Sequence, residues 1–195
     1  MINLNDEHTA PATSQPILAA VRAANGFVPN MFRALSNSPS TLTGFAAMLE
    51  ANDSGTLTPL ERQIVQVTAS VENQAAYCIA GHTTFTEMSG LPLTPIEAIR
   101  KGRPIADRRY QSLVDFTRAV IHHRGHVSES KIEAFKSAGF DDQHILEVIT
   151  GIALKTITNY VSSGFNLPLD HEFQAHAWLD DKQTEPVDTP KVAAG

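Results

Sequence analysis

Helix-start signals are the feature of this sequence that most constrains its fold. Each signal places a residue that favours the N-cap position before a proline or before an apolar run. They stand at Ser38-Pro39, Thr58-Pro59, Thr94-Pro95 and Asp141-Asp142. A glutamate follows three residues after both threonines, which is the spacing of a capping box. No run alternates apolar and polar residues between hairpin turns, so strands are expected to be nearly absent. The sequence therefore predicts an all-α protein.

Apolar residues recur at helical spacing in the segments that follow these signals. Three stripes are each expected to face the core: Leu60, Ile64, Val67 and Val71; Tyr110, Leu113, Thr117, Val120 and Ile121; Leu146, Ile149, Ala153, Ile157 and Tyr160. Glycines stand at several of the expected helix ends. These patterns predict helices over 15–24, 29–35, 39–52, 59–72, 75–89, 95–101, 107–123, 129–138 and 142–163, with a weaker signal over 171–178.

The chain of 195 residues is long enough for one substantial core, and a single domain over residues 14–179 is predicted. The two ends differ from this middle. Residues 1–13 are polar with little periodicity, and residues 180–195 contain prolines and charges without an apolar stripe. Both ends are expected to be disordered or to form arms across a partner subunit.

Charge and composition exclude several functional classes. Fifteen Lys and Arg against 21 Asp and Glu give a net charge of -6 without a basic cluster, so neither nucleic acid nor a membrane surface is an expected partner. No apolar run reaches the roughly 20 residues that span a bilayer, and the N-terminus lacks signal-peptide character. A single cysteine disfavours a secreted disulfide scaffold, so the cytoplasm is expected. No phosphate-binding glycine loop occurs, and no cofactor is predicted.

Cys78 is the only cysteine, and His82 follows it by four residues. On a helix this spacing puts the thiol and the imidazole on one face, where an imidazole can take the proton of a nucleophilic thiol. Glu72 could supply a third titratable group. A helix break at Asn73 would place Cys78 near the positive end of a new helix, which favours a thiolate. The structural alternative is a small buried cysteine beside a histidine that satisfies a local hydrogen bond.

The segment from Glu72 to His82 resembles the signature Glu-x-x-Cys-x-x-Cys-x-x-x-His of the alkylhydroperoxidase D-like and carboxymuconolactone decarboxylase superfamily. Glu72, Cys78 and His82 match the Glu, the second Cys and the His, whereas Ala75 replaces the first Cys.

Other segments are similar to the branch of this superfamily called peroxidase-related proteins. They are Gly26–Leu35, Ser38-Pro39 and Leu57–Arg62. The likeness extends from about residue 15 to residue 170. It implies a compact multi-helix bundle that assembles as a symmetric homo-oligomer, with active sites close to subunit contacts.

The resemblance also implies a catalytic set of Cys78, His82 and Glu72. In members that reduce peroxides, the second Cys attacks, the first resolves the sulfenic acid as a disulfide, and Glu and His relay protons. Some members take the relay glutamate from the preceding helix just after an arginine, where this chain has Gln63 behind Arg62. Without a second cysteine, an external thiol would have to regenerate Cys78. The first hypothesis is therefore thiol-dependent reduction of hydroperoxides through one cysteine.

Two other functions stay open. A cofactor-independent acid–base enzyme of the decarboxylase type would use His82 and Glu72 on a small carboxylate or lactone, with Cys78 as part of the wall. A non-catalytic protein that binds a small molecule is the third hypothesis, because two functional positions of the family differ here, with Ala75 in place of the Cys and Gln63 in place of the Glu.

The remaining histidines give weaker signals. His122, His123 and His126 suggest a metal site, but adjacent histidines on a helix point about 100° apart, and cationic side chains near a helix C-terminus are favourable without any ligand. No metal is predicted there. Either His171 or His176 could still complete the Cys78 site from elsewhere in the fold or from a neighbouring subunit.

Overall fold

The computed structural model describes residues 2–178, and this range contains helices but no strand. The all-α prediction is confirmed, and the helix boundaries lie within about two residues of those expected from the sequence. The elements are α1 (Gln15–Asn25), α2 (Asn30–Leu35), α3 (Pro39–Asp53), α4 (Pro59–Glu72), α5 (Ala76–Met88), α6 (Thr94–Arg100), α7 (Arg108–His122), α8 (Glu129–Ser137), α9 (Asp142–Gly164) and the 3₁₀ helix η1 (His171–His176). In these residues none of the helices has the length and hydropathy to cross a membrane.

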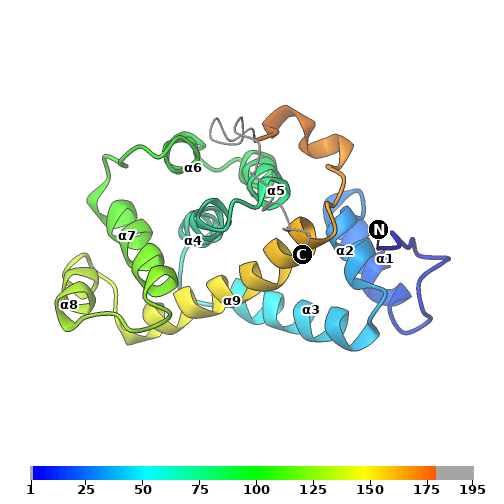
Figure 1. Ribbon diagram of the computed structural model, residues 1–195, viewed down its shortest axis with the longest axis horizontal. Coiled ribbons are helices and arrows are strands. Elements are labelled where there is room, and N and C mark those ends of the chain that lie inside the picture. Colours follow the sequence, from blue (N-terminus) through cyan, green and yellow to red (C-terminus); the bar gives the residue numbers. More distant parts are fainter. Residues whose placement is uncertain (1, 179–195) are drawn as a thin grey trace, which may run out of the picture.

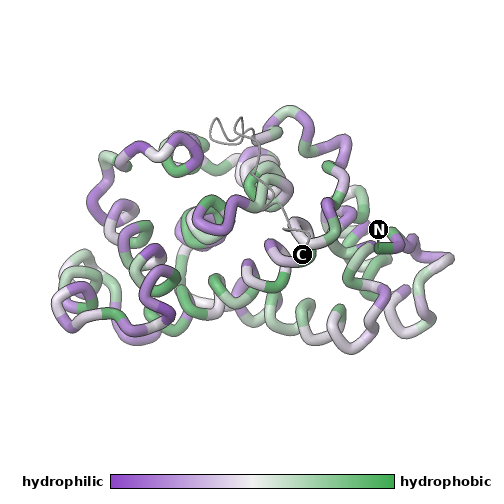
Figure 2. The backbone as a smooth tube through the Cα atoms, viewed as in Figure 1, coloured by the Kyte–Doolittle hydropathy of each residue, from purple (hydrophilic) through white to green (hydrophobic). Residues whose placement is uncertain are grey.

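The helices enclose two apolar clusters. The pocket-side cluster gathers residues of α1, α2, α3, α5 and η1, including Leu18, Leu42 and Phe173. The α7-side cluster gathers residues of α4, α6, α7 and α8, including Ile64 and Phe135. The helix α9 runs across the molecule and contacts both α3 and α7 (Figure 1). In the outer helices α7 and α8, hydrophobic and hydrophilic stretches alternate, as amphipathic helices require (Figure 2).

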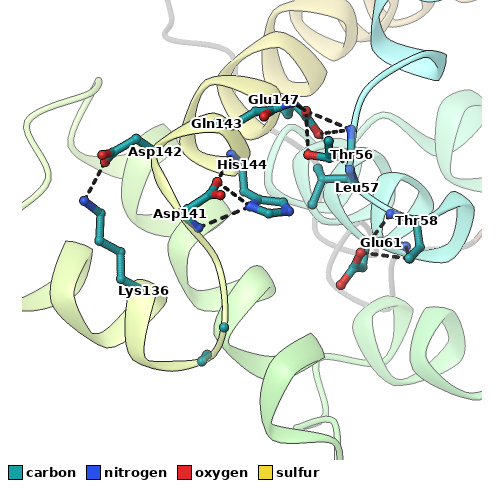
Figure 3. A network of polar contacts seen from close by, with 12 residues as sticks. Thr56, Leu57, Thr58, Glu61, Lys136, Asp141, Asp142, Gln143, His144 and Glu147 are labelled. Carbon is teal, nitrogen blue, oxygen red and sulfur yellow. Dashed lines mark hydrogen bonds and ion pairs between the residues drawn. The ribbon is translucent and has the colours of Figure 1, made fainter.

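A capping box at Thr58 explains where α4 begins. The Thr58 hydroxyl accepts from the Glu61 N–H and the Glu61 carboxylate accepts from the Thr58 N–H, so the predicted capping box is confirmed. The Glu147 carboxylate of α9 accepts from the N–H groups of Thr56 and Leu57, with N···O distances of 2.8 Å in both bonds. These bonds are drawn in Figure 3. The start of α4 is thereby tied to α9. The expected cap at Thr94 is wrong, because Thr94 is already the first residue of α6.

The chain breaks between α4 and α5, as predicted, but the cap differs from the expected one. Asn73 ends α4, Gln74 adopts a positive φ of 53°, and Ala75 takes the N-cap position of α5 without a side-chain hydrogen bond. The predicted N-cap role of Asn73 is therefore wrong. Cys78 nevertheless lies in the first turn of α5, where the helix dipole favours negative charge.

The N-terminal segment is packed against α2. The side chain of Arg33 donates to the carbonyl oxygens of Leu4 and Asn5, at 3.0 and 3.1 Å, and Ala10 is buried. Residues 2–13 are thus ordered on their own chain, which contradicts the expectation of disorder for that part of 1–13. The prediction for residues 180–195 lies outside the described residues.

The third apolar stripe was expected to face the core. That expectation is wrong for three of its five residues, whereas Ile157 packs against the pocket-side cluster. Leu146 and Tyr160 are 65% and 66% exposed, and Ile149 is 44% exposed. The face of α9 that is buried instead includes Val148, Gly151, Lys155, Thr158 and Ser162. A Cβ at Gly151 would come within 2.9 Å of Val65, so the absence of a side chain allows α9 to approach α4 closely.

Candidate functional site

A pocket of about 320 Å³ opens between α2, α3, α4, α5, α9 and η1. Its wall is largely apolar and aromatic, with Met31, Phe32, Phe45, Phe85 and Phe173 among its lining residues. Polar side chains from three helices also line it: Gln63 and Gln66 of α4, Cys78 and His82 of α5, and Lys155 and Thr158 of α9. The pocket therefore combines an apolar volume suited to a small organic molecule with a compact polar wall.

Helix geometry explains why these polar groups face one another. Cys78 and His82 are separated by four residues of α5 and share a face of that helix. Lys155, Thr158 and Ser162 are separated by three and four residues and share a face of α9. These two faces meet, because the Cys78 Sγ lies 3.7 Å from the Ser162 Oγ and His82 bonds Lys155.

The Cys78 thiol is 4% exposed and lies on the pocket wall. Its hydrogen-bond partner is the Ser162 hydroxyl, which itself donates to the Asn159 carbonyl oxygen at 3.0 Å. Since that bond uses the hydroxyl proton, the Ser162 oxygen is left to accept from the thiol. The sulfur is buried with polar contacts and is not sealed in hydrocarbon.

His82 bonds Gln63 and Lys155. Its Nδ1 lies 2.9 Å from the Gln63 Oε1, and its Nε2 lies 2.5 Å from the Lys155 Nζ. An amide oxygen can only accept, so Nδ1 carries the proton and Nε2 is left with a lone pair for the lysine. The expected direct bond between His82 and Cys78 is replaced by this Gln63–His82–Lys155 chain, because both ring nitrogens bond to other groups.

Electrostatics agree with a neutral imidazole. Burial, together with the nearby Lys155 charge, holds the pKa of His82 well below its usual value of 6.5. Burial also lowers the pKa of Lys155 below 10.5, while the neighbouring Cys78 raises it. A lysine with a depressed pKa is a donor that gives up its proton more readily than a solvated one.

Glu72 points to another part of the molecule. Its carboxylate pairs with the Arg118 Nε at 2.7 Å and the His122 Nε2 at 2.6 Å, both on α7. Glu72 follows Gln63 by nine positions, which is about two and a half turns of helix. The two side chains therefore point to opposite sides of α4. Gln63 therefore faces the pocket while Glu72 faces α7, and the structure does not bring Glu72 together with Cys78 and His82.

Three comparisons place this geometry among known proteins. Residues 39–103, which span α3 to the end of α6, match the carboxymuconolactone decarboxylase family. An alkylhydroperoxidase AhpD core, an uncharacterized peroxidase-related protein from Ralstonia eutropha JMP134, superimposes with a TM-score of 0.77 and 24% identity, over 87% of this chain and 92% of that one. The chain therefore has the alkylhydroperoxidase D-like fold, and the segment that holds Cys78 and His82 lies within the residues that match the family.

Two more solved structures share this fold. An uncharacterized peroxidase-related protein from Silicibacter sp. TM1040 has a TM-score of 0.75 and 24% identity, covering 88% of this chain and 91% of that one. The debrominase Bmp8, in a cysteine-to-alanine variant bound to 2,3,4-tribromopyrrole, has a TM-score of 0.75 and 14% identity, covering 90% of this chain and 94% of that one. No curated protein sequence matches the chain closely enough to add a further comparison.

Compared with the signature that it resembles, this chain has the second Cys, as Cys78, and the His, as His82, but the residues around them differ. Ala75 is 1% exposed and contributes no sulfur, while Gln63 occupies a position beside His82 from the preceding helix. Lys155 is the site residue that sequence reasoning missed. It lies mid-way along the predicted helix 142–163, and the only signal was a lone lysine between the apolar residues Leu154 and Ile157.

The other histidines lie away from the pocket wall. His122 bonds Glu72, and His176 bonds the Glu87 carboxylate at 2.9 Å. His123, His126 and His171 are exposed. Across residues 2–178, no group of three or more His, Cys, Asp or Glu side chains is arranged to hold a metal ion.

Proposed function

We propose that this protein is a thiol-dependent oxidoreductase that reduces small organic hydroperoxides through Cys78, with an external thiol as the reductant. The observation that carries the proposal is the position of the Cys78 sulfur on the wall of an apolar pocket that the buried Lys155 also lines. A positive charge beside a thiol favours the nucleophilic thiolate. The apolar wall suits the organic half of a hydroperoxide.

The chemistry balances with one cysteine. The Cys78 thiolate attacks the terminal peroxide oxygen, the O–O bond breaks, and the products are a sulfenic acid and an alkoxide that takes up a proton. An external thiol then condenses with the sulfenic acid, which forms a mixed disulfide and releases water. A second external thiol attacks this mixed disulfide, which restores Cys78 and releases the disulfide of the two external thiols.

The test is the fate of the Cys78 thiol at neutral pH. One equivalent of tert-butyl hydroperoxide is expected to remove this thiol faster than it oxidises free cysteine, and a sulfenic-acid trap should add one label to the intact protein. Cys78→Ser provides the matched control and should acquire no label. A Cys78 that reacts no faster than free cysteine would contradict the proposal.

A second function is supported by the Gln63–His82–Lys155 chain, because this hydrogen-bonded set needs no sulfur. It would serve a cofactor-independent acid–base enzyme acting on a small carboxylate or lactone, with His82 and Lys155 moving protons. In that case Cys78→Ser would keep most of the activity and His82→Ala would abolish it. Saturable binding of such an acid without turnover would instead support a non-catalytic binding protein.

The fold shared with a debrominase adds one arm to the same assay. A brominated pyrrole offered in place of the hydroperoxide would test whether the thiol of this pocket attacks halogen rather than oxygen. Loss of the Cys78 thiol with the brominated pyrrole alone would replace the peroxide assignment. Loss with the hydroperoxide alone would support it.

Assembly as a homo-oligomer is a further proposal that rests on the resemblance, and a cytoplasmic location is one that rests on the cysteine content. Light scattering of the purified protein would measure the assembly directly. The exposed stripe of α9, formed by Leu146, Ile149 and Tyr160, is an apolar face that a second copy could cover. A mass equal to a single chain at micromolar concentration would contradict the oligomer.

A further inference from the structure

Lys155 is a buried cation without a carboxylate partner. Its side chain is 4% exposed and lines the pocket, and among residues 2–178 none of the ion pairs includes it. Burying an ammonium group without an opposite charge is costly, and such groups usually mark functional sites. The hydrogen bond to the neutral His82 ring compensates only in part, because an imidazole supplies no negative charge. A negative charge in the pocket, on Cys78 or on a bound molecule, would complete the compensation.

The neighbouring groups hold Lys155 at the reacting sulfur. Gln63 fixes the His82 ring through Nδ1, and the ring then accepts from the lysine through Nε2. Cys78 precedes His82 by one helical turn on the same face, so the fixed ring keeps the ammonium on the side of the thiol. Cys78 and Lys155 both line the same pocket, and the Cys78 charge raises the pKa of Lys155.

We propose that Lys155 is a catalytic residue of the peroxide reaction, serving both as the counter-charge of the Cys78 thiolate and as the acid that protonates the leaving alkoxide. This inference rests on the proposed function and assigns the substrate-side proton donor. It gives His82 and Gln63 the role of positioning residues, and it leaves Glu72 outside the reaction.

The proton balance closes over one cycle. Cys78 and Lys155 begin as thiolate and ammonium. The thiolate attacks the terminal oxygen, the O–O electron pair leaves with the alkoxide, and the ammonium transfers one proton to that alkoxide, giving an alcohol, a sulfenic acid and a neutral amine. Two external thiols then return Cys78 to a thiol, release water and leave as a disulfide. Transfer of the thiol proton to the amine restores the starting pair.

The pocket offers few competing groups. Its titratable lining residues are Asp53, Tyr77, Cys78, His82 and Lys155. The Asp53 carboxylate is 60% exposed and pairs with Arg62, and the Tyr77 hydroxyl donates to Asp170. Burial holds the pKa of His82 low, so this ring is a poor proton donor near neutral pH. Among these groups, Lys155 is left as the proton donor of the pocket wall.

The experiment compares two oxidants whose leaving groups differ in basicity. tert-Butyl hydroperoxide releases an alkoxide that needs an acid, whereas peracetic acid releases acetate, which leaves without one. Lys155→Met is expected to slow the reaction of Cys78 with tert-butyl hydroperoxide by about 10²–10⁴-fold. The reaction with peracetic acid should slow by a smaller factor, because it is affected only by the loss of the counter-charge. Lys131→Met, at an exposed lysine of α8, is the matched control and should change neither rate.

Lys155→Arg separates the two roles and covers the case in which Lys155→Met fails to fold. Arginine keeps the positive charge but does not release its proton. The pH profile of Cys78 alkylation by iodoacetamide should therefore stay close to that of the unmodified protein, while the rate with tert-butyl hydroperoxide falls selectively.

Two results would contradict the inference, and they differ. If the unmodified protein reduces both oxidants and Lys155 variants slow them by the same factor, Lys155 does not donate the proton, although the proposed function stands. If Cys78 of the unmodified protein reacts with neither oxidant, the proposed function itself fails and the inference fails with it. A selective loss with tert-butyl hydroperoxide supports both.

Discussion

The two apolar clusters of this protein differ in the polar side chains that lie beside them. The α7-side cluster is closed by a stack of Phe116, Phe135 and Phe140, with ring centroids 4.2 and 4.3 Å apart. The pocket-side cluster contains Cys78 and borders His82 and Lys155, and its aromatic rings meet edge to face around a cavity. The comparison indicates that the α7-side cluster is a closed apolar core, whereas the pocket-side cluster accepts buried polar groups at its cavity.

Helix α4 separates the two halves and shows how one helix serves both. Its apolar stripe, which includes Ile64 and Val67, packs in the α7-side cluster, while Gln63 and Gln66 turn toward the pocket. Glu72 lies on the α7 side and pairs there with Arg118. The side of α4 on which a residue lies therefore decides whether it faces the pocket in which we propose that peroxide is reduced.

The largest expected effect is on stability, from the closed half. Phe135 is 1% exposed between two stacked rings, so Phe135→Ala is expected to lower the free energy of unfolding by about 3–5 kcal/mol. Urea unfolding would measure this loss. In the fraction that stays folded, the reactivity of Cys78 should be unchanged, and a large drop in that reactivity would contradict the separation of the two halves.

A smaller loss is expected from the pocket-side half. The Tyr77 hydroxyl donates to the Asp170 carboxylate and accepts from the Met31 N–H at 3.1 Å. Tyr77→Phe removes both bonds and leaves buried polar groups without this partner, at a cost of about 1–3 kcal/mol. The same urea titration measures it. An unchanged stability would show that these bonds do not hold η1 and α2 together.

The two halves should also respond to acid in different pH ranges. Because burial lowers the pKa of His82, the unfolded chain binds more protons there below pH 6.5, and the stability falls as the pH drops, by at most about 1.4 kcal/mol per pH unit. Glu61 responds later. Burial opposes its shift, but bonds from Thr58 and Arg109 lower its pKa, so its contribution is lost below 4.5.

Urea unfolding between pH 7 and pH 4 distinguishes these groups. His82→Gln should flatten the decline between pH 6.5 and pH 5, and Glu61→Gln should alter only the decline below pH 4.5. A His82→Gln profile that is parallel to that of the unmodified protein would contradict the lowered pKa of His82.

The smallest effect is expected at Glu72. Its pairs with Arg118 and His122 are partly exposed, so Glu72→Gln is expected to cost about 0.2–1 kcal/mol of stability. The rate of peroxide-dependent loss of the Cys78 thiol should stay the same. A fall of tenfold or more in that rate would return Glu72 to the catalytic set.

Much of the fold could be predicted because its signals are local. Capping residues, prolines at helix starts and apolar spacing gave the helix ranges, including the break after α4. Periodicity failed for α9, because Leu146 and Tyr160 repeat at helical spacing as core residues do and yet are exposed. Spacing alone cannot tell a buried face from an exposed apolar one.

The sequence by itself determined the all-α class, the single thiol and the shared helix face of Cys78 and His82, since each depends on residues close together along the chain. Only the tertiary structure decided that His82 bonds Gln63 and Lys155, that Ser162 contacts Cys78, and that Glu72 turns to α7. These contacts depend on how α4, α5, α7 and α9 pack against one another. They join residues 19 to 84 positions apart, which no local pattern encodes.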